Sequence, residues 1–493
     1  MRKIGSLIKC TVFLLLLCLV LKGVTGILVP KNYTGEWSSP VPTYSGFYNM
    51  EKNTVDVVFL GSSHAYASFC PQVLYDNYGI TSYNLGMGNQ NILLNYFWLK
   101  EALKTQSPKA VVLEGTFLFP RVDEPANTTE AALQKSLSYM KWSSNRINAI
   151  KAICKADTGQ KFADYIPNIR FHDRWKELHE EDFSAGDIES RNELKGYSSG
   201  FYGYCEYKQY KPYGLQEDSC EEMLPVMKEY LDKIAELCRE KNIELILTLT
   251  PSAGASTKRH NALRKYSEEK EILFYDFNTK DAFSEMNYNF QTDNSDTEHP
   301  NVWGAAKITD KIGQILKETL GLPAHEDTQW SSTSDFYKDK LYDAGISHID
   351  DIYDYLDAID NDRYTVFMSV KDDSSYSMNE TIVNAMNQLG LRTDLRGRFR
   401  ESYYAVIEEG NVLYEQCADG PLEYVGSIRK GRTMFKIISE GSAVGNSSSI
   451  CVEGRELSVN SRGLNIVVID NESCSVIDSV CFDTCDGLAA VRE

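Results

Sequence analysis

The chain has 493 residues, more than one compact domain usually holds, so two or three domains are expected. Its composition, 42% hydrophobic and 25% charged, is that of a globular protein without low-complexity tracts. The formal net charge of −19 argues against nucleic acid or an anionic membrane surface as the main partner, because both would repel an acidic protein.

The N-terminus carries a targeting signal. Basic residues precede an apolar run from Thr11 to Leu21, and Gly23 to Val29 is again mostly apolar. The first run has the length of a signal peptide, whereas both together are long enough to span a bilayer. Because Val24-Thr25-Gly26 matches a cleavage site poorly, we predict an uncleaved single-pass membrane anchor over residues 1–29, with the remaining chain outside the cell. A secreted protein with a cleaved signal is the alternative.

The cysteines leave the pairing open. Ten of the twelve lie outside the predicted anchor, and an even number in an exported chain permits disulfides. No CxxC pair occurs, and the spacings do not indicate which cysteines would bond. Zinc at Cys474, Cys481 and Cys485 is an alternative that lacks a nearby histidine. We predict no metal ion and no cofactor.

Two segments that lack the apolar pattern of buried helices and strands divide the chain. Residues 30–54, rich in Pro, Tyr, Ser and Gly, and the polar residues 322–334 predict exposed linkers. They would separate the anchor from a first domain over residues 55–321, and that domain from a second over residues 335–493. Within the first domain, residues 119–217 are polar, aromatic and irregular. They predict an insertion over the functional edge, either a lid or substrate-binding segment or a purely structural excursion.

The stretch around Ser63 is the centre of the first domain. Val55 and the residues from Val57 to Leu60 form an apolar run typical of a strand buried on both faces. Gly61 permits a tight turn, and Ser62 and Ser63 precede a predicted helix. A serine at such a turn lies at the carboxyl edge of the sheet, where backbone N–H groups can stabilise an oxyanion. Ordinary capping serines are the alternative.

Strands and helices alternate through the first domain, which predicts an α/β fold with a parallel sheet. Functional loops should gather at the carboxyl ends of its strands. Further strands are predicted at residues 80–85, 110–114, 243–249 and 272–276, and helices at residues 65–78, 92–104, 219–241, 255–270 and 305–320.

The second domain is predicted to be a smaller α/β domain with mostly β content. Helices are predicted at residues 335–359 and 379–389, and strands at residues 364–370, 403–408, 433–439, 449–452, 463–470 and 475–482.

A loop before the last helix of the first domain carries a second set of candidate catalytic groups. Asp296 and His299 lie three residues apart in it. His299 would take a proton from the serine, while Asp296 would fix the histidine tautomer and stabilise the imidazolium. His64 directly follows the serine and is the rival base, but an adjacent side chain usually points away from the reaction face. A capping loop with a surface histidine is the structural alternative.

These blocks carry a family resemblance over roughly residues 55–321. Leu60-Gly61-Ser62-Ser63-His64, Asn84-Leu85-Gly86-Met87-Gly88, Glu114-Gly115-Thr116 and Asp296-x-x-His299 resemble the ordered motifs of the SGNH (GDSL-like) hydrolases. The resemblance implies a flavodoxin-like three-layer fold, with Ser63 as the nucleophile. It also implies an oxyanion hole made by the backbone N–H groups of Ser63 and Gly88. The sequence departs from the family at Phe117, where an Asn donor is expected.

One branch of that family is the most similar. The missing Asn, a GSS turn and an N-terminal anchor resemble extracytoplasmic proteins of teichoic-acid D-alanylation and exopolysaccharide O-acetylation, which work beside a membrane-bound O-acyltransferase. This implies an extracellular serine esterase or acyltransferase that acts on acyl, and most simply acetyl, esters of a cell-surface polysaccharide or teichoic-acid-like glycan. The alternative is an inert glycan-binding protein on the same scaffold, which Phe117 favours.

The second domain resembles another family. Its similarity to the interleukin-like EMT inducer domain, and to the stem domain of the protein O-mannose N-acetylglucosaminyltransferase, covers about residues 335–490. The stem-domain resemblance implies glycan binding, and a structural module is the alternative. In those domains the segment that corresponds to residues 462–484 usually comes first, whereas here it comes last, which indicates a circular permutation. The resemblance rests on Tyr364-Thr365-Val366-Phe367, Lys371-Asp372-Asp373, Ser402 to Val406, Ser461 to Val468 and Val480 to Thr484.

Overall fold

The structure, a computed structural model, describes residues 2–29, 40–120, 125, 127–183, 193–214 and 219–492. The chain divides into two compact units, Met1–Lys338 and Asp339–Glu493, and the boundary falls inside helix α16 (Ser334–Ile346). Parts of the predicted linker 30–54 and of the predicted insertion 119–217 lie outside the described residues.

The first unit is built on a five-stranded parallel sheet, which confirms the predicted α/β fold. Its strand order, β2-β1-β3-β4-β5, is that of flavodoxin-like folds. Val58 and Leu60 of the first strand face one apolar core, and Val57 and Phe59 face another, so helices cover both faces. The strands are β1 (Val57–Leu60), β2 (Ser82–Asn84), β3 (Ala110–Glu114), β4 (Glu244–Leu249) and β5 (Leu273–Asp276).

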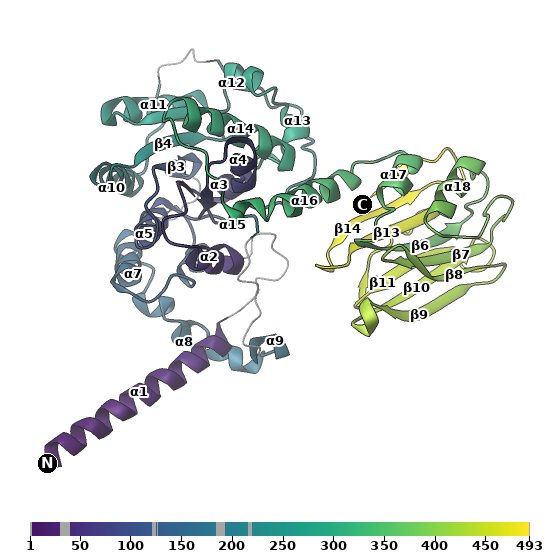
Figure 1. Cartoon of the computed structure of the whole chain (residues 1–493), viewed down its shortest axis with the longest axis horizontal. Coiled ribbons are helices and arrows are strands. Elements are labelled where there is room, and N and C mark those ends of the chain that lie inside the picture. The colour runs from purple at the N-terminus through teal and green to yellow at the C-terminus, as the bar shows by residue number, and fades with distance from the viewer. Residues whose placement is uncertain are drawn as a thin grey trace. The chain divides into compact units, whose positions relative to one another are not determined.

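The helices form two outer layers around this sheet (Figure 1). One layer contains α2 (Pro40–Asn49), α5 (Ile92–Ala102), α7 (Ser144–Ala156), α10 (Pro225–Lys241) and α11 (Thr257–Lys270). The other contains α4 (Pro71–Tyr78) and α14 (Val302–Glu318), which pack against each other. Shorter helices are α3 (Ser63–Ser68), η1 (Thr116–Leu118), α6 (Glu130–Leu137), η2 (Phe162–Tyr165), α8 (Pro167–Arg170), η3 (His172–Lys176), α9 (Glu180–Phe183), α12 (Lys280–Glu285), α13 (Phe290–Asp293) and α15 (Thr328–Ser331).

The helix predicted over residues 65–78 is two helices, α3 and α4. Pro71 is the first residue of α4, and a proline pushes the residue before it out of the helical region. Cys70 accordingly has extended φ and ψ angles of −98° and 107°. The chain therefore turns after the serines, and only the short α3 follows them directly.

Both predicted linkers pack into the first unit, so their description as exposed segments is wrong where the structure describes them. Tyr44 and Phe47 of α2 are buried, and Tyr44 stacks on Trp98 with the ring centroids 4.1 Å apart. In the second segment, Leu322 is buried in one core and Trp330 in the other. Aromatic side chains thus hold both segments on the layers around the sheet.

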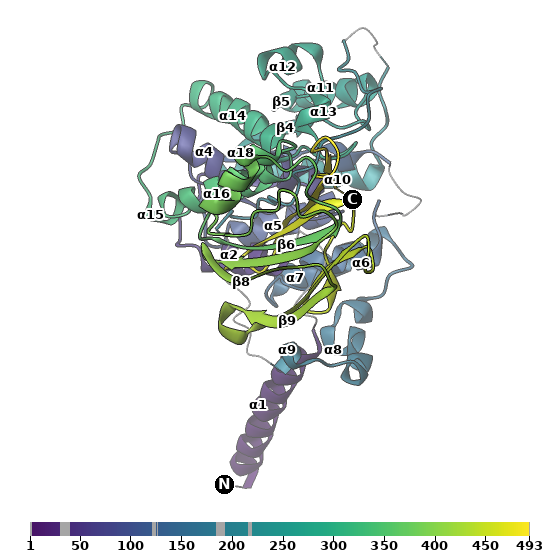
Figure 2. The same ribbon diagram turned by 90° about the vertical axis from the view of Figure 1, so that its right-hand side faces the viewer.

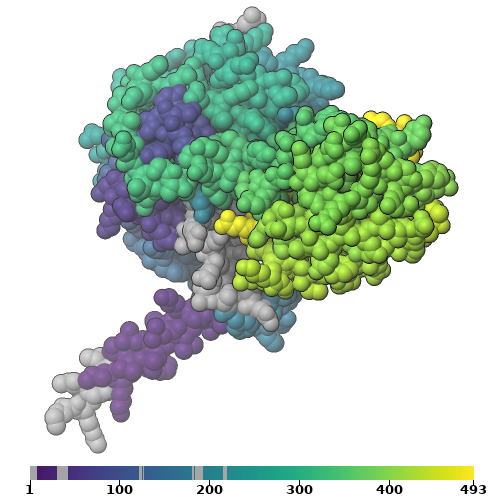
Figure 3. All heavy atoms as spheres, turned by 45° about the vertical axis from the view of Figure 1, so that its right-hand side comes forward, coloured from purple at the N-terminus to yellow at the C-terminus, as the bar shows by residue number. Residues whose placement is uncertain are grey.

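The first helix, α1 (Arg2–Leu28), has the composition of a membrane span. Its 21-residue stretch Ile8–Leu28 is long and apolar enough to cross a bilayer, as signal sequences also are. Figure 3 shows α1 as a rod that leaves the first unit, and its side chains from Ile8 to Val24 are exposed. The helix therefore fits the predicted anchor or a signal.

The second unit is a separate, mostly β structure, as predicted. Its ten-stranded sheet has the central order β12-β11-β10-β6-β13-β14-β15, with β7 pairing to β6 and β8, and β9 pairing to β10. Figure 2 shows the curvature of this sheet. The strands are β6 (Tyr364–Asp372), β7 (Ser402–Glu408), β8 (Asn411–Ala418), β9 (Leu422–Ile428), β10 (Thr433–Gly441), β11 (Ser447–Val452), β12 (Arg455–Glu456), β13 (Gly463–Asp470), β14 (Val476–Phe482) and β15 (Ala490–Val491), and η4 is Arg429–Gly431.

Helices α17 (Ile352–Ala358) and α18 (Glu380–Gln388) share a core with this sheet. The helix predicted over residues 335–359 is wrong as a single element, because α16 ends at Ile346 and α17 begins anew. The Asp351 side chain accepts from the backbone N–H groups of Tyr353 and Asp354 and so caps the second helix.

We expect residues 335–493 to fold when expressed alone, because the second unit has its own cores on both faces of its sheet. A purified fragment should melt in one cooperative transition, followed by circular dichroism. A fragment that aggregates or lacks a transition would contradict an independent domain.

In the described residues, no disulfide joins any two of the twelve cysteines. Among these residues, moreover, no three His, Cys, Asp or Glu side chains are grouped to hold a metal ion, so zinc at Cys474, Cys481 and Cys485 has no support.

Burial should make three of these thiols unreactive. It raises the pKa of Cys70, Cys238 and Cys481 to about 12, whereas Cys220 is exposed. The thiolate is the nucleophile, so at pH 8 the buried thiols remain protonated. Iodoacetamide should therefore alkylate Cys220 in the native protein and the other three only after unfolding, as read by peptide mass spectrometry. Native alkylation of Cys70 at the rate of Cys220 would contradict this burial.

Candidate active site

The turn after β1 places Ser63 at the carboxyl edge of the sheet. A Cβ atom at Gly61 would lie 2.7 Å from Ala65 Cβ and 3.0 Å from Glu114 Cβ, so only glycine fits the close approach of β1, α3 and β3. Ser63 is the first residue of α3 and is 9% exposed. Ser62 is buried at the N-cap, and its side chain makes no capping hydrogen bond.

Buried amides hold this turn against the loop that follows β2. Asn95 Oδ1 accepts hydrogen bonds from the Gly61 N–H and from Gln90 Nε2, both at 2.9 Å. Gln90 Nε2 also donates to the Leu85 carbonyl at 3.0 Å, and the Tyr44 hydroxyl lies 3.0 Å from Gln90 Oε1. The N-terminal segment predicted as a linker thus supports the site, and the sequence patterns did not single out these amides.

The loop before α14 carries Asp296 and His299 in a fixed turn. Asp296 Oδ1 accepts from the backbone N–H groups of Glu298 at 2.7 Å and of His299 at 2.8 Å. The Ser295 N–H donates to the His299 carbonyl at 2.9 Å, and Ala253 N–H donates to the Thr297 carbonyl at 2.7 Å. These bonds order a loop whose side chains remain partly exposed.

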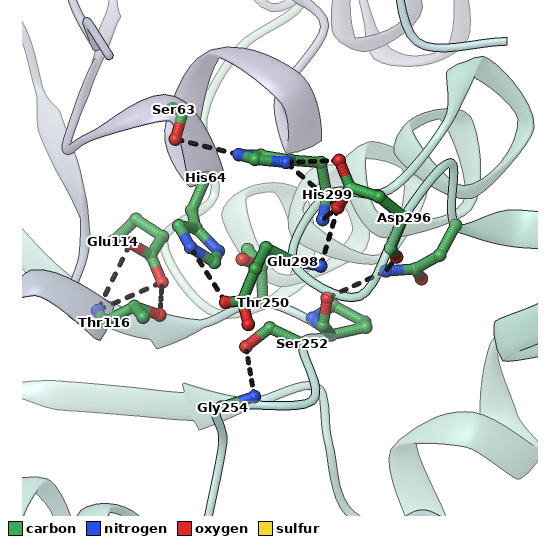
Figure 4. A network of polar contacts seen from close by, with 12 residues as sticks. Ser63, His64, Glu114, Thr116, Thr250, Ser252, Gly254, Asp296, Glu298 and His299 are labelled. Atoms are coloured by element: carbon green, nitrogen blue, oxygen red, sulfur yellow. Dashed lines mark hydrogen bonds and ion pairs between the residues drawn. The ribbon is translucent and has the colours of Figure 1, made fainter. Parts of the chain in front are cut away.

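Three side chains from the two loops form one hydrogen-bonded row (Figure 4). His299 Nε2 lies 2.9 Å from Ser63 Oγ, and His299 Nδ1 lies 2.9 Å from Asp296 Oδ2. Burial acts to raise the pKa of the half-exposed Asp296 carboxyl, but its bonds to His299 and to backbone N–H groups outweigh it and lower the pKa below its usual value. Asp296 is therefore an anion at neutral pH that faces the ring nitrogen opposite the serine.

The rival base, His64, is more deeply buried than His299. Its side chain is fully buried, and its Nε2 lies 3.6 Å from Glu298 Oε2. The His64 and His299 rings are neighbours, with centroids 5.3 Å apart. It is thus His299 whose nitrogen reaches Ser63 Oγ, while His64 packs beneath it toward Glu298 (Figure 4). The sequence reasoning missed Glu298, whose role depends on tertiary contact.

The insertion after β3 supplies one wall of the site. Phe201 stacks on the His299 ring with centroids 4.9 Å apart, and its carbonyl accepts from the Val302 N–H at the start of α14. Gly196 permits the chain to return alongside β2, because a Cβ there would lie 1.8 Å from the Asn84 carbonyl oxygen. The aromatic character of the insertion was visible in the sequence, but no spacing singled out Phe201.

The two predicted oxyanion donors border the same edge. The Ser63 N–H is at the start of α3, and the Gly88 N–H lies in the loop after β2; within the described residues neither donates to a protein acceptor. Phe117 is buried in the core on the α5 side, and its hydrocarbon side chain has no hydrogen-bond donor. The Glu114 carboxylate nearby accepts from the Thr116 N–H and hydroxyl.

Comparisons with known proteins give one family match and several similar structures. The model of the family Interleukin-like EMT inducer matches residues 326–411. The chain is similar to the crystal structure of a GDSL-like lipase from Bacteroides thetaiotaomicron, with 12% identity, a TM-score of 0.27 and coverage of 58% of this chain and 100% of that one. A search of curated proteins finds no match.

Two further solved structures resemble it to a similar degree. A protein assigned as an acylhydrolase from Bacteroides fragilis is 16% identical, with a TM-score of 0.27 and coverage of 58% and 99% of the two chains. A protein assigned to the lipolytic G-D-S-L family from Desulfitobacterium hafniense is 13% identical, with a TM-score of 0.25 and coverage of 53% and 98%.

Proposed function

We propose that the first unit is a membrane-anchored extracellular serine esterase or O-acyltransferase. The observation that carries the proposal is the hydrogen-bonded row from Ser63 through His299 to Asp296. A hydroxyl, an imidazole and a carboxylate in this order are the groups that acyl transfer through a covalent intermediate requires.

In the proposed reaction, Ser63 Oγ attacks the acyl carbonyl carbon while His299 Nε2 takes its proton. Asp296 stabilises the imidazolium that forms, and the N–H groups of Ser63 and Gly88 donate to the oxyanion. The intermediate collapses to an acyl-serine when the leaving alkoxide takes the proton from His299. Water or an acceptor hydroxyl then attacks the ester, with His299 again as base, and Ser63 is regenerated.

We propose acyl esters of a cell-surface polysaccharide or teichoic-acid-like glycan as substrates, and acetyl as the simplest group. An apolar helix that fits an anchor and the resemblance to D-alanylation and O-acetylation proteins support this choice. A membrane-bound O-acyltransferase is the proposed partner, and the second unit is the proposed glycan-binding module. Together they would hold the site close to the cell surface.

An inert glycan-binding protein on the same scaffold is the second candidate. The observation that favours it is Phe117, buried where the resemblance expects an Asn donor. Loss of one oxyanion donor costs about 2.7–4 kcal/mol, or 10²–10³-fold in kcat, in a serine protease. A weakened enzyme and a pure binder are therefore both consistent with this replacement.

The test is turnover by the full chain in nanodiscs. Release of acetate from an acetylated glycan and hydrolysis of p-nitrophenyl acetate should both exceed the rates of a Ser63→Ala variant. Glycan binding with no turnover of any ester above that variant would contradict the enzyme and support the binder.

A further inference from the structure

Three short helices of the insertion pack against the end of the apolar helix. α8, η3 and α9 all contact α1, and they lie beside its C-terminal end in both Figure 1 and Figure 2. Thr25 Oγ1 lies 3.0 Å from Asn168 Oδ1, and Arg174 Nη1 donates to the Leu28 carbonyl at 3.0 Å. Arg174 also pairs with Asp182 at 2.8 Å, so one guanidinium ties α1, η3 and α9 together.

These contacts fix the position of the three helices along the axis of α1, beside the C-terminal end of its apolar stretch. Twenty-one residues of α-helix rise about 30 Å, which equals the hydrocarbon thickness of a bilayer. Leu28 is the last residue of that stretch, and its carbonyl has no partner inside the helix. If α1 spans the membrane, Asn168 and Arg174 therefore lie at its outer surface.

Each of the three helices contains one large apolar side chain that is exposed to solvent. Ile169 of α8 is 48% exposed, Trp175 of η3 is 64% exposed and Phe183 of α9 is 63% exposed. Single exposed apolar side chains are ordinary, but here three lie on short elements that all contact one end of an apolar helix, so we take them together as one patch. Tryptophan is, moreover, enriched where proteins meet the lipid headgroups.

The charges around the patch do not favour binding by electrostatic attraction. From Lys161 to Phe183, with both ends included, the chain carries four Lys or Arg residues and six Asp or Glu residues. Arg170 pairs with Glu130 at 2.7 Å, and Lys176 pairs with Asp173 at 3.3 Å. A surface with this balance would gain little from anionic lipids, and its apolar side chains would carry the contact.

We propose that α8, η3 and α9 form a membrane-resting patch that inserts Ile169, Trp175 and Phe183 into the headgroup region of the bilayer. The inference rests on the proposed anchor. It adds a second contact between the first unit and the membrane, so the unit does not swing freely on a single helix. Zwitterionic lipid is sufficient for this contact.

The test uses the full chain in phosphatidylcholine nanodiscs whose lipids carry bromine near the headgroup end or near the methyl end of the acyl chains. Trp175→Phe is compared with Trp142→Phe. Trp142 is also exposed, but it lies just before the N-terminal end of α7, whereas η2 follows the C-terminal end of that helix. Bromine near the headgroups should quench a component of the emission that Trp175→Phe removes and Trp142→Phe keeps. Bromine near the methyl ends should quench that component less.

The outcomes separate the patch from the anchor. If the chain enters nanodiscs but the Trp175 component is insensitive to bromine and quenched by acrylamide, the patch is refuted and the anchor stands. That result is also expected if the patch binds another membrane protein instead of lipid. If the chain does not enter nanodiscs at all, the anchor is refuted and the patch with it. Neither result bears on the chemistry of Ser63.

Discussion

Alanine at Ser63 or at His299 is expected to reduce acyl-ester turnover at least about 10³-fold, and the double variant to lose little more, because the two groups act as one unit. The imidazole nitrogen already lies 2.9 Å from the hydroxyl, so removing either partner removes the proton transfer. Asp296→Asn should also lower kcat strongly, since it removes the charge that holds the histidine tautomer. Turnover of a small ester and of an acetylated glycan measures all of these effects.

Ser62→Ala is the matched control. Ser62 is adjacent and buried, but it is a serine whose side chain makes no capping bond, so the variant should keep most of the activity. Thermal melts should show that both variants fold. Asp296→Asn keeps an oxygen that can accept the backbone N–H bonds of the turn, and His299→Ala removes only the ring that packs on Phe201. If His64→Ala abolishes turnover in a folded protein and His299→Ala does not, the assignment of the base is wrong.

Trp330→Ala is expected to destabilise the first unit by about 3–5 kcal/mol, the cost of removing a large aromatic from a packed core. Trp330 is fully buried, its ring lies 6.3 Å from the ring of Tyr75, and Lys195 Nζ lies 5.2 Å from its centroid. Its carbonyl also accepts from Gln72 Nε2 at 3.0 Å. Denaturant unfolding of the full chain measures the loss.

Trp142→Ala is the comparison for that variant. The Trp142 ring is half exposed and the Arg146 guanidinium lies 4.1 Å from its centroid, so the change should cost only about 0.5–1 kcal/mol. If Trp330→Ala unfolds at the same denaturant concentration as the wild type, residues 322–334 are an exposed linker after all. A loss several times that of Trp142→Ala makes them part of the first unit.

The fold of the first unit could be predicted because its strands β1, β2 and β3 are buried on both faces. Such strands are continuous apolar runs, and Ala110–Glu114 was predicted with the bounds that β3 has. In the second unit, β8 and β9 were missed because their side chains are half exposed, so neither an apolar run nor a clean alternation marks them. The two predicted linkers were wrongly described as exposed. Their Tyr and Trp residues stand in Pro- or Ser-rich segments without a helical or strand periodicity, although these side chains pack into the cores of the first unit.

The residues of the site also fall into two groups, those that the sequence predicted and those that it did not. The order of the motifs led from the sequence to Ser63, Asp296 and His299, and the structure brings these three side chains together. Phe201 and Glu298 border the same histidines, but they arrive from the insertion and from a turn whose course no local pattern gives. Side chains that act through tertiary contact are therefore the part that sequence reasoning alone does not reach.

The central claim is that Ser63 is a nucleophile, and covalent labelling tests it most directly. A fluorophosphonate probe, which reacts with activated serines, is incubated with the full chain, and the modified peptide is identified by mass spectrometry. The account predicts one adduct, on Ser63, that is lost in Ser63→Ala and strongly reduced in His299→Ala, with Ser62→Ala labelled like the wild type. Equal labelling of Ser63→Ala and wild type, or no adduct on Ser63 in a folded wild-type protein, would contradict it.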